Sequence, residues 1–179
     1  ARTLKIVLQA VGNLSLEQRK AILRELTMTG HAVLDQSNVR LEAYAAWAAE
    51  VQAGATPEEA LARVREVGDA LQQSKQTWHG YVGPVLRAQA RHAAGSDQAR
   101  AFLCEMVGGG VVGPTALASL GKVMAPCSAT TVEERMQAYR DVAMTEGPLA
   151  GCREVVIEAW RVDVEAGTSP ARATERLQA

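Results

Sequence analysis

The side chains best suited to catalysis or metal binding are few in this sequence, and they are scattered. They are three histidines and three cysteines: His31, His79, His92, Cys104, Cys127 and Cys152. No two of them stand at the close spacing, such as Cys-x-x-Cys or His-Glu-x-x-His, that brings zinc ligands together. A nucleophile–base pair of Cys104 with His79 has no support from spacing either. We therefore predict no catalytic residue, no metal and no cofactor, and an enzyme with a site between the two halves of the chain is the second alternative.

The glycine-rich segment at residues 107–114 is the most flexible part of the chain. It reads Val-Gly-Gly-Gly-Val-Val-Gly-Pro. A phosphate-binding loop would follow a strand and end in Gly-Lys-Ser/Thr, and both features are missing. We interpret this segment as a hinge between helices.

The middle of the chain is locally basic although the whole chain has a formal net charge of −1. The cations that form this basic face are Lys75, Arg87, Arg91 and Arg100. Arg87 and Arg91 are four residues apart, so they share one face of a helix. A nucleic-acid-binding regulator that uses this face is the first alternative function. Three or four cations neutralise too few phosphates for strong binding, which favours an ordinary solvated face.

The cysteines and the termini indicate the compartment. An odd number of scattered thiols is not the pattern of a disulfide-bonded secreted domain, so we expect a cytoplasmic (or intravirion) protein. Residues 1–15 lack the layout of a signal peptide. The longest uncharged run, residues 106–121, is too short to span a bilayer. We predict no membrane contact.

Composition predicts the class of fold. Apolar residues make up 47% of the chain and aromatic residues only 4%, so Ala, Leu and Val must fill the core. Ala has the highest helix propensity, and no segment alternates apolar and polar residues as a half-buried strand does. We predict an all-α protein, a compact helical bundle of eight or nine helices.

Capping residues predict several helix boundaries. Thr56-Pro57 followed by two acids is a strong start signal, because the hydroxyl, the proline ring and the negative charges all suit a helix N-terminus. Ser37 is the expected N-cap of the preceding helix. Gly83-Pro84 is expected to interrupt the chain before a helix over residues 85–94.

Two parts of the chain repeat the same order of residues. Residues 16–30 read LEQRKAILRELTMTG, and residues 132–147 read VEERMQAYRDVAMTEG. The blocks that begin at Trp47 and Trp160 also share an Ala-Gly stop, a proline, an alanine and an arginine in the same order. We interpret this as an internal duplication, with copies at residues 1–71 and 114–179 around middle helices at residues 72–113. Such short units bury little apolar surface alone, so we expect the copies to pack together in one domain or on another chain.

Each copy contributes one tryptophan at a matching position, Trp47 and Trp160. The functional hypothesis makes these rings, with Tyr44, the contact residues of a self-association surface. The alternative is that the two tryptophans are structural anchors in the core.

One segment is similar to the last two helices of retroviral capsid C-terminal domains. Pro126 is followed by Thr-Val-Glu-Glu-Arg-Met at residues 131–136. Three upstream residues stand where that family has its major homology region: Gln72, Lys75 and Trp78. Gln73 and Gln76 replace the Gly and Glu of that region, and Gly83-Pro84 replaces its Arg. The resemblance covers about half of the chain and implies self-assembly.

These patterns favour a non-enzymatic helical assembly or adaptor protein, for example a structural or virion component. We expect it to act through protein–protein contacts, as a homo-oligomer or with a protein partner. The duplicated amphipathic unit and the lack of a convergent catalytic set are the two observations behind this prediction.

Overall fold

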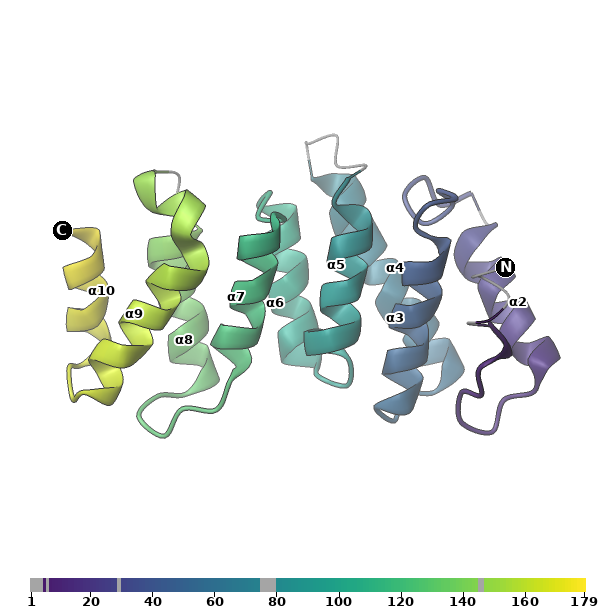
Figure 1. The fold of residues 1–179 in the computed structure, drawn as a ribbon, viewed down its shortest axis with the longest axis horizontal. Coiled ribbons are helices and arrows are strands. Elements are labelled where there is room, and N and C mark those ends of the chain that lie inside the picture. The colour runs from purple at the N-terminus through teal and green to yellow at the C-terminus, as the bar shows by residue number, and fades with distance from the viewer. Residues whose placement is uncertain (1–4, 6, 29, 75–79, 145–146) are drawn as a thin grey trace. The chain divides into compact units, whose positions relative to one another are not determined.

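The computed structural model describes residues 5, 7–28, 30–74, 80–144 and 147–179 (Figure 1). It confirms the predicted all-α class, because these residues contain nine α-helices and no strand. The helices are α2 (Leu16–Thr27), α3 (Arg40–Gln52), α4 (Pro57–Gln73), α5 (Val82–Ala88), α6 (Asp97–Gly108), α7 (Pro114–Met124), α8 (Val132–Ala138), α9 (Arg153–Glu165) and α10 (Pro170–Gln178). Two π-helices, η1 (Gln89–Ala93) and η2 (Tyr139–Ala143), continue α5 and α8, and a 3₁₀ helix, η3 (Pro148–Cys152), precedes α9. Within the described ranges, no helix is both long and apolar enough to cross a bilayer.

Reciprocal capping boxes begin three of the helices. Ser15, Thr56 and Thr131 each accept the backbone N–H three residues on, and the side chain of that third residue accepts the N–H of the cap. Two otherwise unpaired N–H groups are satisfied at each start, and a cap of this kind is worth about 1 kcal/mol. Local sequence therefore determines where α2, α4 and α8 begin.

Two expected boundaries were wrong. The N-cap of α3 is Val39, which makes no side-chain capping bond, and not Ser37. The first turn of α5 contains both Gly83 and Pro84, which were expected to interrupt the helix. A proline is tolerated there because the first four N–H groups of a helix have no acceptor within it.

The chain divides into two compact units, residues 1–110 (unit 1) and residues 111–179 (unit 2). The division follows the three consecutive glycines of the expected hinge. The middle helices α5, η1 and α6 belong to unit 1, together with α2, α3 and α4.

In unit 1, α3 and α5 lie in one layer, and α4 and α6 lie in the layer behind it (Figure 1). Helix α3 is central, because it packs against α2, α4, α5 and η1. The core between the layers contains Trp47, Val64 and Phe102, all fully buried. Ala46 is also fully buried, and so small a side chain lets a neighbouring helix approach α3 closely.

In unit 2, α7 and α9 lie in one layer and α8 and α10 lie behind them (Figure 1). Helix α9 packs against α7, α8 and α10. The core is built around Leu120, Tyr139 and Trp160, and the hydroxyl groups of Tyr139 and Ser119 are 2.7 Å apart.

The α3–α4 hairpin of unit 1 and the α9–α10 hairpin of unit 2 share one anchor. The indole Nε1 of Trp47 donates to the carbonyl of Pro57 at 3.1 Å, and Nε1 of Trp160 donates to the carbonyl of Pro170 at 3.3 Å. Ten residues separate donor and acceptor in both cases. We call two residues counterparts when they lie at the same distance along the chain from Trp47 and Trp160.

Further contacts recur at counterpart residues of these hairpins. Both turns contain a glycine at positive φ: Gly54 at 108° and Gly167 at 95°. Behind each turn an ion pair joins the two helices: Arg63 to Glu50 at 3.1 Å, and Arg176 to Asp163 at 3.1 Å. The local geometry of the two hairpins is therefore alike, while descent from one duplicated block stays a prediction.

Two arginines of the repeated segment are buried. Arg19 Nη1 donates to the carbonyl of Val7 at 2.9 Å, and Arg135 Nε donates to the carbonyl of Val123 at 2.6 Å. Burial lowers the pKa of Arg135. Backbone carbonyls that the fold brings close satisfy both buried guanidinium groups.

Candidate functional site

His31 has both of its ring nitrogens engaged. Nδ1 accepts the backbone N–H groups of Val33 at 3.3 Å and Leu34 at 3.2 Å. Nε2 lies 3.1 Å from Oδ1 of Asp69. With Nδ1 as the acceptor, the ring proton sits on Nε2 and is donated to the carboxylate. This ring therefore has no lone pair available to act as a general base toward a substrate.

The other two histidines do not complete a site. His79 lies outside the described residues. His92 is half-buried on η1, and burial together with the charge of Arg91 lowers its pKa. In the parts of the chain that the structure describes, no group of three or more His, Cys, Asp and Glu side chains is arranged to hold a metal ion.

Cys104 on α6 is a poor nucleophile. Burial, and then the neighbouring Glu66 carboxylate, raise the pKa of its thiol to about 11. Because the thiolate is the reactive form, this cysteine is almost wholly unreactive at neutral pH. Cys127 is half-buried and Cys152 is exposed.

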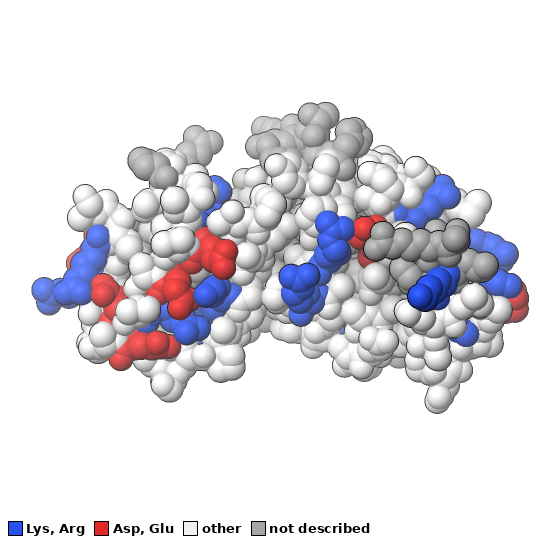
Figure 2. All heavy atoms as spheres, viewed as in Figure 1, with Lys and Arg blue, Asp and Glu red and all other residues white. Residues whose placement is uncertain are grey.

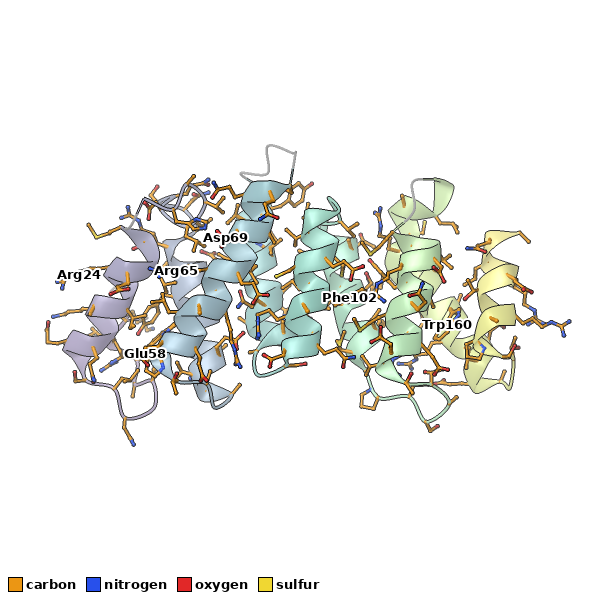
Figure 3. The ribbon with its side chains drawn as sticks, turned by 180° about the vertical axis from the view of Figure 1, so that it is seen from behind. Arg24, Glu58, Arg65, Asp69, Phe102 and Trp160 are labelled. Carbon is orange, nitrogen blue, oxygen red and sulfur yellow. The ribbon has the colours of Figure 1, made fainter. Side chains whose placement is uncertain are left out.

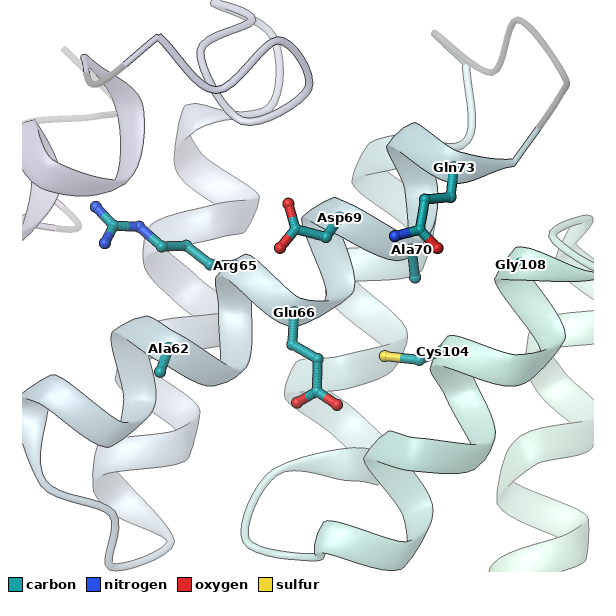
Figure 4. Close-up of a pocket in the computed structure, with 8 residues that line it drawn as sticks. All are labelled: Ala62, Arg65, Glu66, Asp69, Ala70, Gln73, Cys104 and Gly108. Atoms are coloured by element: carbon teal, nitrogen blue, oxygen red, sulfur yellow. The ribbon is translucent and has the colours of Figure 1, made fainter.

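An open groove of about 570 Å³ lies between α4 and α6 (Figure 4). Its lining residues are Ala62, Arg65, Glu66, Asp69, Ala70, Gln73, Cys104 and Gly108. Glu66 and Cys104 both reach into the space between the two helices (Figure 4). The carboxylate of Glu66 accepts from Arg100 Nε at 2.9 Å. Charged groups of this groove are thus held by partners of the same unit, and Cys104 has no activating base in it.

The predicted basic face is partly neutralised by carboxylates from other helices. Arg100 is buried, and its guanidinium donates to Glu66 and Asp97. Arg87 is paired with Glu42 of α3 at 2.9 Å. Arg91 is exposed. Figure 2 shows basic side chains over α5 with acidic side chains beside them. Lys75 lies outside the described residues. The structure therefore does not gather the described arginines on one open face, because Arg100 points into unit 1.

The three aromatic residues of the interaction hypothesis are core residues. Trp47, Trp160 and Tyr44 are 0%, 1% and 1% exposed. Trp160 lies between α9 and α10, where its indole N–H also meets the hydroxyl of Thr174 at 3.1 Å (Figure 3). The rings of Tyr44 and Trp47 contact each other, with centroids 5.2 Å apart. In this fold they are anchors, and a partner protein has no access to them.

Some of the outward-facing side chains of α9 form an apolar stripe that the sequence analysis missed. Its members are Val155, Ala159 and Val162 on α9 and Ala166, the C-cap that follows the helix, at successive spacings of four, three and four residues. Val155 is 67% exposed and Val162 is 55% exposed. This spacing places all four on one side of the helix. Charged side chains of both signs lie around α9 on the face seen in Figure 2.

The stripe faces away from the packed side of α9. The inward face carries Val156, Ile157, Trp160 and Val164, all buried in unit 2. Helix α9 is thus apolar on two sides, and no helix described in unit 2 covers the second one.

Comparison with known proteins finds no match of this chain to a family model, to a curated protein or to a solved structure.

Proposed function

We propose that this chain is a non-enzymatic helical adaptor or assembly protein that acts through contacts with other protein chains. The observation that carries the proposal is the apolar stripe on α9, with two valines more than half exposed. A helix of a globular protein normally turns such side chains toward a neighbour. A row of them at spacings of three and four residues is the pattern of a helix–helix interface.

The chemistry of unit 1 supports a non-enzymatic role. The imidazole of His31 has no free nitrogen, and the thiol of Cys104 stays protonated at neutral pH. Activated nucleophiles need the opposite conditions, namely a lowered pKa or an adjacent free base.

The test is to place charge on the stripe and to measure association. Val155→Asp with Val162→Asp adds two carboxylates to the stripe, and Ser128→Asp with Ala129→Asp adds two to the exposed loop between α7 and α8 as a matched control. All four residues are exposed, so each change should cost less than about 0.5 kcal/mol of stability. Circular dichroism checks that both variants remain folded.

We expect sedimentation and affinity purification from the producing cells to show association of the wild type and of the loop variant. The stripe variant should lose it. A strictly monomeric wild type that binds nothing would contradict the proposal, as would a stripe variant that associates as the wild type does.

A further inference from the structure

The side of α3 that corresponds to the α9 stripe is covered by other helices of unit 1. The counterparts of Val155, Ala159 and Val162 are Glu42, Ala46 and Ala49 on α3. In unit 1 this side of α3 is covered by α5 and η1. Ala46 is fully buried there, whereas its counterpart Ala159 is exposed.

The cover on α3 is held by a few specific contacts. Arg87 of α5 pairs with Glu42 at 2.9 Å. Gln89 Nε2 of η1 and the backbone N–H of Gly95 each donate to the buried carboxylate of Glu50 at 3.3 Å. A side chain at Gly95 would come within 2.8 Å of Ala53 Cβ, so the covering chain needs a glycine at this close approach.

The charge pattern of the open hairpin is incomplete by comparison. Arg63 of α4 binds Glu50 and also Asp97 of α6, at 3.3 Å, and its side chain is 22% exposed. Its counterpart Arg176 binds Asp163 in the same way and is 51% exposed. No described helix of unit 2 brings Arg176 the second carboxylate that Asp97 brings to Arg63.

We propose that the open side of the α9–α10 hairpin is the docking site for a helical hairpin of another protein, seated as α5–η1 and α6 are seated on α3 and α4. This occupant would place an apolar side chain opposite Val155. At the counterpart position on α3, Glu42 instead faces a cation, Arg87. It would place small residues along the rest of the stripe. A carboxylate at the start of its second helix would complete the ion pairs of Arg176.

Within the described residues the element that matches this occupant is already in use, which favours a hairpin supplied by a different protein. The hairpin with this chemistry, α5–η1 with α6, covers α3 and α4 and buries Glu50. A second copy would have to open unit 1 to supply it, which would take Gln89 and Gly95 away from the buried carboxylate of Glu50 and leave it with Arg63 alone. This inference rests on the proposed function and specifies the partner for it.

The probe is a synthetic peptide of residues 80–110, which contains α5, η1 and α6, with Arg87→Leu to suit Val155. Fluorescence anisotropy of the labelled peptide measures its binding to the full chain. The unmodified peptide and the Val155→Glu protein provide a charge exchange, because together they restore the pairing seen between Arg87 and Glu42. A further peptide, with Asp97→Asn in addition to Arg87→Leu, tests the carboxylate for Arg176.

We expect each matched pair of peptide and protein to bind at least tenfold more tightly than the two mismatched pairs. Loss of the Asp97 charge should weaken binding by a similar factor. Equal affinities for all pairs, or no binding by any peptide, would overturn the hairpin inference and leave the proposed function intact. Self-association of the wild type that Val155→Asp with Val162→Asp abolishes would also overturn it, because a second copy would then be the occupant. If no peptide bound and the wild type also showed no association with itself or with another protein, the proposed function would be refuted as well.

Discussion

A comparison of Glu50 with its counterpart Asp163 tests how much the covering segments α5 and η1 contribute to the stability of the ion pair in the α3–α4 hairpin. Both carboxylates accept from an arginine of the following helix at 3.1 Å. Glu50 is fully buried and also accepts from Gln89 and Gly95, whereas the side chain of Asp163 is 37% exposed. Glu50→Gln keeps the shape but turns an amide, with its own N–H donors, toward three existing donors.

The expected cost of Glu50→Gln is about 3 kcal/mol of unfolding free energy for unit 1. Removing one partner of a buried ion pair costs roughly 3–5 kcal/mol, and the amide oxygen still accepts one bond, so the lower end of that range applies. Asp163→Asn is the matched control. It breaks a partly exposed pair, for which about 0.5 kcal/mol is expected.

Urea denaturation followed by far-ultraviolet circular dichroism measures both values. If the two units unfold in separate steps, each substitution should move only the step of its own unit. Similar losses for the two variants would refute the reasoning, because the cover of α5 and η1 would then contribute nothing to the strength of the buried pair. A loss below about 1 kcal/mol for Glu50→Gln would do the same.

Two further tests compare pairs of residues: Gly68 with Gly108, and Cys104 with Cys152. Gly68→Ala should destabilise by about 1 kcal/mol in the same urea assay, although alanine favours a helix, because the new Cβ would lie 3.0 Å from Cε1 of the tethered His31 ring. Gly108→Ala meets nothing within 4 Å and should be neutral or stabilising. Iodoacetamide should label Cys152 within minutes at pH 8 but label Cys104 slowly, with a rate that rises about tenfold per pH unit toward its pKa of about 11. Equal labelling of the two thiols by mass spectrometry would show that Cys104 is not shielded.

Local sequence was enough to predict the class of fold and many helix starts. Thr56, Pro57 and Glu59 make their capping contacts within four residues of chain, so the residues that decide the boundary are all visible together. The hydrogen bonds that anchor Trp47 and Trp160 are also local in the chain, because each indole donates to a carbonyl ten residues away. Val39 was missed as a helix start because it makes no side-chain contact that a capping rule recognises.

The charges of the candidate site required the tertiary structure. Arg100 belongs to a locally basic segment, yet its carboxylate partner Glu66 lies 34 residues away on α4. Glu50 reaches Gln89 across 39 residues. Whether a charge faces solvent or a partner depends on which helices meet, and residue spacing along one helix does not contain that information.

Helix α9 shows most clearly which features the local sequence determines and which depend on tertiary packing. By itself the sequence determined that this segment is a helix that carries apolar side chains, including Val155, Val156, Ile157, Trp160 and Val162. Apolar residues on every side give no unique inward face. Only packing against α7, α8 and α10 decided that Val156, Ile157 and Trp160 fill the core while Val155 and Val162 remain outside. The physical reason is that burial is a property of the neighbours, and these neighbours are distant in the chain.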